Sequence, residues 1–242
     1  MITLTHGMVL AAGLGTRMRP LTDDRPKPLL ELDGRSLLDH ALDRLQAASV
    51  HQAVVNAHWH ADQIAVAMSL RADPCITLQK EDTLLETGGG VTLALPNLGA
   101  GPFAVVNGDA FWLDGPTPAL TRLAAAFDTE QMDALLLMVR TTQVDGAVGH
   151  GDFLLDPLGR MRRPKEREIA PYLYAGVQIL SPALFADAPV GAFSLNRLYN
   201  QAMENGRLYG LVHDGAWFHL STPEDLHHAE ETLRAGLARA LF

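Results

Sequence analysis

Two glycines and an arginine near the start of the chain could together bind a phosphate chain. Gly13 and Gly15 follow the apolar run 8–12, and Arg17 stands two residues further on. Glycine permits a sharp turn that exposes backbone N–H groups, and arginine adds a fixed positive charge. The spacing lacks the Lys-Ser or Lys-Thr of a Walker loop and also the third glycine of a dinucleotide fingerprint, where Met18 stands instead.

A second cation, Lys27, lies between Pro26 and Pro28. Proline fixes its own φ and biases the preceding residue toward an extended backbone, so we expect the lysine ammonium to project from a stiff segment. A stiff lysine suits a site that holds a triphosphate in one pose. An ordinary turn with cations on the surface is the alternative that these residues leave open.

Asp109 could supply the carboxylate that a divalent cation needs beside those phosphates. It ends the motif Asn107-Gly108-Asp109, which follows the apolar run 103–106. A carboxylate at the end of a buried strand can meet both Mg²⁺ and phosphate oxygens. An Asx turn after a strand would explain the same residues without a metal.

A second glycine cluster at residues 88–90 follows Glu86 and Thr87. Consecutive glycines permit a ligand to approach the backbone closely, and we expect them to lie beside a nucleobase and ribose. A flexible loop that precedes a helix starting near Val91 is the alternative.

These residues must be positioned by short apolar runs that alternate with helical patterns. We expect strands at 7–11, 52–56, 75–79, 103–107, 134–140 and 172–180, and helices at 37–45, 61–70, 91–95 and 223–240. This order predicts an α/β fold with a parallel sheet covered on both faces and ligands bound beyond the carboxyl ends of its strands. Turn signals at 145–146, 156–157 and 158–159 make the second half less regular.

Two of the expected helices carry N-terminal capping signals. Ser36 is followed by Asp39 three residues later, and Thr222 is followed by Pro223 and two acidic residues. The closing helix has an apolar face that could pack internally or against a second subunit. That face comprises Leu226, Ala229, Leu233 and Leu237.

The composition indicates one large domain at residues 1–242. The chain has 242 residues, of which 48% are hydrophobic, and it contains no linker-like stretch. The net charge of −9 argues against nucleic acid or an anionic membrane as a main partner. A single cysteine, Cys75, excludes an internal disulfide, and no segment is typical of a membrane span or a signal peptide, so we expect a cytoplasmic protein.

The string Gly-x-Gly-Thr-Arg-Met-x-Pro-x-Thr at 13–22, with Pro-Lys-Pro-Leu at 26–29, resembles the signature of the sugar-1-phosphate nucleotidyltransferase family. Members of that family join a nucleoside triphosphate to a sugar phosphate and release pyrophosphate. The resemblance runs from about residue 7 to 226. It implies a single-domain, Rossmann-like (GT-A-like) three-layer sandwich with a mostly parallel central sheet, a nucleotide-binding half at about 7–110 and a sugar-binding half at about 111–242.

One branch of that family matches further motifs. Glu-Thr-Gly-Gly-Gly at 86–90 is most similar to the uridylyltransferases that act on N-acetylmuramate 1-phosphate in peptidoglycan recycling. The segments 106–109, 151–153, 174–176 and 181–185 are similar to the same branch. The resemblance therefore implies UTP and a sugar 1-phosphate as substrates.

The resemblance also implies a role for each matching position. The implied catalytic residues are Arg17, Lys27 and Asp109, with Asp109 as ligand of Mg²⁺. The implied nucleotide-binding residues are Leu10, Ala11, Ala12, Gly13, Gly15, Thr16, Arg17, Lys27, Glu86, Thr87 and Gly88. The implied sugar-binding residues are Asn107, Gly151, Asp152, Tyr174, Gly176 and Lys165, and for Lys165 a solvated basic turn is an equal alternative.

The sequence departs from the family at one position. Relatives read Trp-x-Asp-Val-Gly-Thr near the end, with the aspartate as second metal ligand, whereas this chain has His219 in that place. Magnesium prefers oxygen ligands, so histidine weakens such a site or favours Mn²⁺. Three roles are open for His219: metal ligand, hydrogen-bond partner of a phosphate, or packed structural residue.

Two other functions are alternatives to the uridylyltransferase hypothesis. The nearest alternative is a guanylyltransferase that acts on mannose or heptose 1-phosphate. The choice of base depends on a few hydrogen bonds near residues 85–88, and Gln79 or Glu81 are further candidates for contacting the base. A nucleotide-binding regulatory protein that has lost activity is the other, and only His219 and Ser221 favour it. Sugar identity and oligomeric state do not follow from the sequence.

Overall fold

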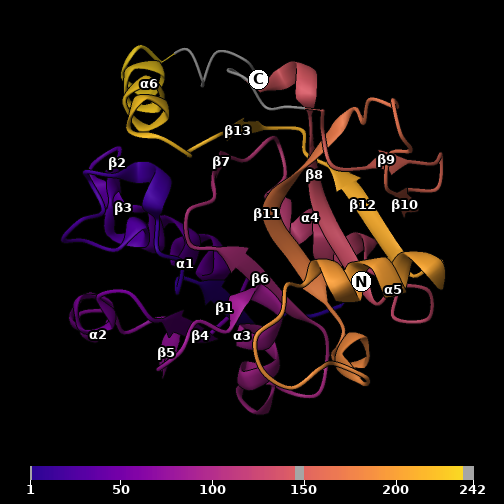
Figure 1. The fold of residues 1–242 in the computed structure, drawn as a ribbon, viewed down its shortest axis with the longest axis horizontal. Helices are drawn as coiled ribbons and strands as arrows, with labels where there is room; N and C mark the ends of the chain where they lie inside the picture. Colours follow the sequence, from indigo (N-terminus) through magenta and orange to yellow (C-terminus); the bar gives the residue numbers. More distant parts are fainter. Residues whose placement is uncertain (1, 145–149, 237–242) are drawn as a thin grey trace.

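A seven-stranded sheet forms the centre of the protein. The computed structural model describes residues 2–144 and 150–236. The strands lie in the order β12-β8-β11-β6-β1-β4-β5 (Figure 1). Their bounds are β1 His6–Leu10, β4 Gln52–Ala57, β5 Cys75–Lys80, β6 Phe103–Asn107, β8 Ala134–Arg140, β11 Tyr172–Leu180 and β12 Leu208–Val212.

The sheet is mostly parallel, as the sequence predicted. Only β11 runs against its neighbours β6 and β8, and the other neighbouring pairs are parallel. The central parallel strands β1, β4 and β6 are mostly apolar because both faces of the sheet are buried there, whereas the edge strand β5 is partly exposed and carries polar residues. In β1, for example, Met8 packs into one buried cluster and Val9 into the other.

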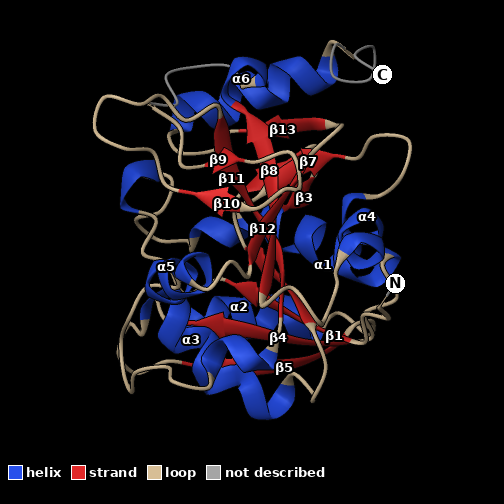
Figure 2. Cartoon of the chain, turned by 90° about the vertical axis from the view of Figure 1, so that its right-hand side faces the viewer, coloured by secondary structure: helices blue, strands red, loops and turns tan. Residues whose placement is uncertain are grey.

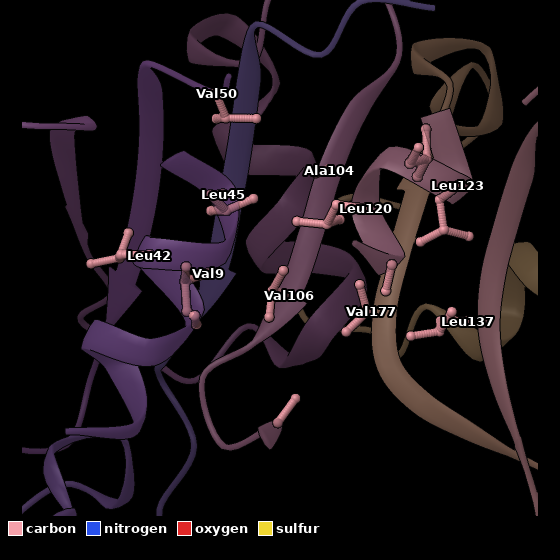
Figure 3. Packing of buried hydrophobic residues seen from close by; sticks show 14 of the residues in the cluster. Val9, Leu42, Leu45, Val50, Ala104, Val106, Leu120, Leu123, Leu137 and Val177 are labelled. Carbon is pink, nitrogen blue, oxygen red and sulfur yellow. The ribbon is translucent and has the colours of Figure 1, made fainter. Parts of the chain in front are cut away.

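Helices cover both faces and complete the three layers. One face packs against α1 (Leu37–Ala47), α2 (Ala61–Ser69) and α4 (Ala119–Ala126), and the other against α3 (Glu86–Ala94) and α5 (Asn196–Glu204). Figure 2 shows α1 and α4 on the opposite side of the sheet from α3 and α5. Figure 3 shows the first of these interfaces, in which Val9, Val106 and Val177 of the sheet lie close to Leu42, Leu45, Leu120 and Leu123 of the helices.

A smaller cluster stands apart from this core. It joins the hairpin of β2 (Glu31–Leu32) and β3 (Arg35–Ser36), the ribbon of β7 (Phe111–Leu113) and β13 (Ala216–Phe218), and α6 (Pro223–Arg234). Ala229 is buried in it, and Leu226 and Leu233 pack against it. The apolar face of the closing helix is therefore packed internally as far as the described residues reach, and Leu237 lies outside them.

The remaining elements are short. Among the described residues, the hairpin of β9 and β10 and several 3-10 turns connect the larger elements. Their bounds are β9 Leu154–Leu155, β10 Met161–Arg162, η1 Thr16–Met18, η2 Lys27–Leu29, η3 Leu95–Asn97, η4 Thr141–Gln143 and η5 Pro182–Phe185.

The expected capping contacts are confirmed. The Ser36 hydroxyl accepts a hydrogen bond from the Asp39 N–H at 3.0 Å. Thr222 and Asp225 form a reciprocal capping box at the start of α6, with Pro223 as its first residue. Among the described helices, none is both long and apolar enough to cross a membrane.

Two expected helix bounds are wrong. Helix α3 begins at Glu86, not near Val91, so the glycine cluster is part of a helix and not a flexible loop. Helix α6 ends at Arg234, because Ala235 caps it and Gly236 adopts a left-handed φ of +68°. Residues 237–240 of the expected helix and the turn signal at 145–146 lie outside the described residues.

Candidate active site

The carboxyl ends of three parallel strands meet at the centre of the candidate site. Leu10 at the end of β1 is in register with Asn56 of β4 on one side and Asn107 of β6 on the other. The Ala11 N–H donates to Asn56 Oδ1 at 2.8 Å, and the Gly108 N–H donates to the Leu10 carbonyl at 2.9 Å. These bonds hold the turns after β1 and β6 beside each other, as expected for ligand-binding loops of a parallel sheet.

Of the two glycines after β1, Gly15 is the one whose conformation requires glycine. It has φ of +62° at the start of η1, and a Cβ there would lie 3.1 Å from the Lys27 Cβ. A Cβ on Gly13 would have no described atom within 4 Å. Gly15 therefore shapes the turn, while the open side of Gly13 leaves room for a ligand.

Lys27 is buried, with 8% of its surface exposed, and it joins three segments of the chain. Its ammonium donates to Asp109 Oδ2 at 2.7 Å and to the Leu220 carbonyl at 2.5 Å. Pro26 is extended, but Lys27 itself begins the 3-10 turn η2, which differs from the extended backbone that we expected for the residue before Pro28. The turn directs the ammonium inward, onto the carboxylate.

Three adjoining cavities of about 540, 330 and 320 Å³ form one cleft around Asn107, which lines all of them. The first cavity is lined by the expected residues Leu10, Ala12, Gly13, Gly15, Thr16, Arg17, Lys27, Glu86, Thr87 and Asp109. The second is lined by Arg17, Asp109, Asp152, Tyr174, Gly176 and His219. Asp152 and Tyr174 also line the third.

Four expected site residues do not line these cavities. Ala11 is buried, and its N–H is already bonded to Asn56. Gly151 faces the Ala170 carbonyl, which would lie 2.1 Å from an added Cβ. Lys165 is exposed to solvent, in agreement with the alternative of a solvated turn.

The fourth, Gly88, belongs to the glycine cluster that we expected to meet the nucleobase. An added Cβ on Gly88 would lie 2.3 Å from the Phe193 ring, and one on Gly89 would lie 2.4 Å from the Gly191 carbonyl. The Gly88 and Gly89 N–H groups both donate to the Phe193 carbonyl, at 2.8 and 3.1 Å. These glycines therefore permit tight packing of α3 against the segment 191–193. Of the motif at 86–90, only Glu86 and Thr87 line the cleft.

Gln79 and Glu81 also face inward. Glu81 is 6% exposed and accepts hydrogen bonds from Asn56 at 2.8 Å and from the Leu85 N–H at 3.2 Å. Gln79 donates to the Gly90 carbonyl at 3.0 Å. Both residues support the start of α3, and neither lines the three cavities.

Several cleft residues were not expected from the sequence. The polar or charged ones are Asn56, Arg163, Gln178, Ser194, Asn196, Tyr199 and Ser221. Asn56 had a usable signal, because it is a polar residue near the end of an apolar strand, as Asn107 is. Arg163 had none, because the basic run 162–167 offers four cations, and only packing determines which one enters the cleft.

The donors in the second cavity fit a divalent cation that a substrate phosphate also ligates. Asp109 keeps 41% of its side-chain surface exposed although Oδ2 is bonded to Lys27, and His219 lines the same cavity. No group of three metal-binding side chains occurs among the described residues. Magnesium sites in phosphate-transferring enzymes commonly combine one or two carboxylates with phosphate oxygens, so two protein donors are compatible with such a site.

Comparison with known proteins agrees with this architecture. The family described as "MobA-like NTP transferase domain" matches residues 7–213. The chain is 45% identical to an N-acetylmuramate alpha-1-phosphate uridylyltransferase of Caulobacter vibrioides, over 93% of the chain and 96% of that protein. It is 34% identical to the protein of the same name from Neisseria meningitidis serogroup B, over 92% and 96%.

A solved structure shows the same fold. The crystal structure of a UDP-glucose pyrophosphorylase complexed with UDP-glucose superimposes with a TM-score of 0.80 over 96% of this chain and 99% of that one, at 16% sequence identity. At this identity the likeness concerns the fold alone.

Proposed function

The chain belongs to the MobA-like NTP transferase family, and from this premise we propose that it transfers the uridylyl group of UTP to N-acetylmuramate α-1-phosphate. The products are UDP-N-acetylmuramate and pyrophosphate, a reaction that serves peptidoglycan recycling. The uridylyltransferase relatives span almost the same length as this chain, which supports the same reaction.

One observation carries the proposal: Lys27 and Asp109 form a 2.7 Å ion pair at the carboxyl edge of the sheet, in the largest of the three cavities. A buried lysine beside a half-exposed carboxylate is suited to a site where phosphates and a metal meet. It has no evident use in a protein that only binds nucleotide.

The reaction needs no protein nucleophile. An oxygen of the sugar phosphate attacks the α-phosphorus of UTP, and a new bond forms between them. The bond from the α-phosphorus to the oxygen that bridges to the β-phosphate breaks, and pyrophosphate leaves with that electron pair. The protein must therefore align two anions in line and neutralise their charge.

The proposed roles follow the positions of the side chains. Arg17 and the backbone of the turn at 13–16 hold the β- and γ-phosphates, and Lys27 contacts the α-phosphate and the incoming phosphate. We assign Thr87, which lines the first cavity, to the nucleoside, and Asn107 and Asp152, which line the third, to the sugar. Residues up to about 110 would thus bind mainly the nucleotide and the later ones mainly the sugar.

We assign the metal to Asp109, with His219 as the second protein donor and with substrate phosphates completing the shell. Mg²⁺, or Mn²⁺, neutralises charge on the phosphate oxygens when it is bound.

Pyrophosphate release tests this proposal. UTP, GTP, CTP and dTTP are each paired with the 1-phosphates of N-acetylmuramate, N-acetylglucosamine, glucose, mannose and heptose, with Mg²⁺ or Mn²⁺. We expect the highest kcat/KM for UTP with N-acetylmuramate 1-phosphate. A preference for GTP with mannose or heptose 1-phosphate would instead make the protein a guanylyltransferase. Nucleotide binding without turnover of any pair would favour the inactive regulatory protein.

A further inference from the structure

The third cavity contains a cation that the proposed reaction leaves unused. Arg163 lines this cavity, whereas Arg17, Lys27 and Asp109 do not. Within the part of the chain that the structure describes, no carboxylate lies within ion-pair distance of Arg163. Asp152 also lines this cavity and its charge acts on Arg163, but its carboxylate forms no ion pair with the guanidinium, which leaves the guanidinium able to pair with an anionic group of a ligand.

Neutral contacts hold Arg163 in place. Its guanidinium lies 4.0 Å from the centre of the Phe153 ring, donates to the side-chain oxygen of Asn196, and reaches the Asp152 carbonyl at 3.5 Å. Burial lowers the pKa of Arg163, although a charge of opposite sign on Asp152 acts against this. The side chain is therefore oriented and partly desolvated before a ligand arrives, which strengthens its attraction for an anion.

A buried donor without an acceptor lies in the same cavity. Gln178 is 0% exposed, and its side-chain oxygen accepts a hydrogen bond of 2.5 Å from the Tyr199 hydroxyl, which leaves its amide nitrogen without a partner among the described residues. The Tyr174 hydroxyl is buried in the same cavity and interacts with the Tyr199 hydroxyl. Burial raises the pKa of both tyrosines, so both remain protonated. Buried donors without acceptors are costly unless a ligand supplies oxygen atoms.

The reacting phosphate of the acceptor is not this anion. It must meet the α-phosphate beside Lys27 and Asp109, and neither residue reaches the third cavity. The cavity adjoins the second one through Asn107, Asp152 and Tyr174, so a sugar between them can present a second group to Arg163.

We propose that Arg163 binds the lactyl carboxylate of N-acetylmuramate and so selects this sugar over N-acetylglucosamine, which lacks that group. This inference rests on the proposed function. Arg163 is a specificity residue, because it contacts the part of the substrate that does not react.

The neighbouring hairpin explains why Arg163 and not Lys165 enters the cleft. Arg162 donates to both oxygens of Glu168, each at 2.6 Å, and the hydrogen bonds from Arg162 and from the Lys165 N–H lower the pKa of Glu168 to about 2. This pair closes the turn with Lys165 on its solvent side and Arg163 over Phe153.

Binding of two nucleotide sugars tests the inference. UDP-N-acetylmuramate and UDP-N-acetylglucosamine differ only in the lactyl group, and calorimetry measures both without turnover. We expect Arg163→Gln to weaken UDP-N-acetylmuramate about ten- to one-hundred-fold, the usual range for a lost charge-assisted hydrogen bond, and to change UDP-N-acetylglucosamine less than about two-fold. The affinity of Arg163→Lys for UDP-N-acetylmuramate should lie between those of the wild type and Arg163→Gln.

Lys165→Gln is the matched control, because it removes a cation from the same turn but outside the cleft. It should leave both affinities within about two-fold of wild type. Equal weakening of both nucleotide sugars by Arg163→Gln would overturn the inference, since Arg163 would then bind a group that the two share. Unchanged affinity of Arg163→Gln for both nucleotide sugars would also overturn the inference. A wild-type protein that binds neither UDP-sugar would instead contradict the proposed function.

Discussion

At the scale of single residues, the ion pair between Lys27 and Asp109 joins positions 82 apart in the sequence. The two partners have different surroundings, because Lys27 is almost fully buried and Asp109 is 41% exposed on its side chain. Removing one partner therefore has different consequences from removing the other. An unpaired buried ammonium costs stability, whereas an unpaired exposed carboxylate is solvated.

We predict that Asp109→Asn and Lys27→Met each lower kcat by at least about a hundred-fold, the usual effect of removing one group that stabilises charge in a transition state. Only Asp109→Asn should also lower the free energy of unfolding, by about 1–3 kcal/mol, because it leaves the buried Lys27 without its carboxylate. Pyrophosphate release and urea unfolding measure the two effects. Asp62→Asn, which removes a carboxylate from an exposed ion pair with Lys80, is the control. Near-normal turnover of both variants would contradict the proposed site.

His219 allows a test of the metal shell. Replacement of His219 by aspartate should lower the Mg²⁺ concentration for half-maximal activity by about ten-fold, because Mg²⁺ prefers oxygen ligands. A titration of activity with Mg²⁺ measures this. His227→Asp adds the same carboxylate at an exposed position of α6 and should have no effect. An unchanged titration for His219→Asp would remove this residue from the metal shell.

At the scale of elements, strand β11 changes register at the cleft. The pairing with β8 shifts between Tyr174 and Gln178, and Gly176 between them has φ of +80°. An added Cβ on Gly176 would lie 3.1 Å from the Asn107 amide. This irregularity brings β11 close to the end of β6 and places Asn107 at the junction of the three cavities.

Gly176→Ala should therefore disturb the sugar site. We predict a loss of about 1–2 kcal/mol in stability, because φ is positive, together with a several-fold rise in the KM for the sugar phosphate as Asn107 shifts. Gly206→Ala is the matched control: Gly206 has φ of +66° but no described atom within 4 Å of an added Cβ. Gly206→Ala should lower the free energy of unfolding by a similar amount and leave the KM for the sugar phosphate unchanged. Equal KM values for the two variants would show that Asn107 does not contact the sugar phosphate.

The start of α6 should make stability depend on pH. Burial alone would raise the pKa of Asp225, but hydrogen bonds from the Ser221 and Thr222 N–H groups outweigh it, and the pKa lies below its usual 3.8. A lowered pKa in the folded state contributes stability above pH about 4, which is lost as the pH falls through the folded value.

We therefore expect the wild-type urea midpoint to fall more between pH 6 and pH 3 than that of Asp225→Asn, which cannot ionise. Far-UV circular dichroism follows this unfolding. Glu224→Gln, in the same helical turn, is the control and should behave like the wild type. Parallel pH profiles for wild type and Asp225→Asn would contradict this contribution of α6.

At the scale of the whole molecule, the cleft draws its walls from both parts of the chain. The first cavity is lined by residues of the turn after β1 and also by Ser194 and Ser221, which come from the second half. A nucleotide bound there contacts segments that are distant in sequence, so its binding should stabilise the whole fold and not one part alone.

UTP with Mg²⁺ at one hundred times its dissociation constant should stabilise the protein by about 2.7 kcal/mol. For a chain of this size, that shift corresponds to a rise in Tm of about 5–10 °C. Differential scanning fluorimetry measures it, with GTP at the same concentration as the comparison. An equally large rise in Tm with GTP would contradict the proposed preference for uridine.

Six strands of the central sheet and most of the residues at its edge could be predicted from the sequence, whereas β12 was missed. The bounds expected for 103–107, 134–140 and 172–180 agree with β6, β8 and β11, because strands buried on both faces are continuous apolar runs that can be recognised locally. Arg17, Asn107 and Asp109 are likewise recognisable as polar residues at the end of such a run or just after a glycine. Lys27 is recognisable as a cation between two prolines, and the structure brings all four residues into one cleft.

Which other side chains face the cleft depends on contacts between distant segments and could not be predicted from the sequence. Gly88 meets Phe193, which lies 105 positions later in the sequence, so its role in packing cannot be found from the glycine cluster itself. The choice of Arg163 over Lys165 depends on the Phe153 ring and on the pair of Arg162 with Glu168. The physical reason is common to both cases: backbone preference is local, whereas the direction of a side chain in an irregular segment is set by contacts with distant parts of the chain.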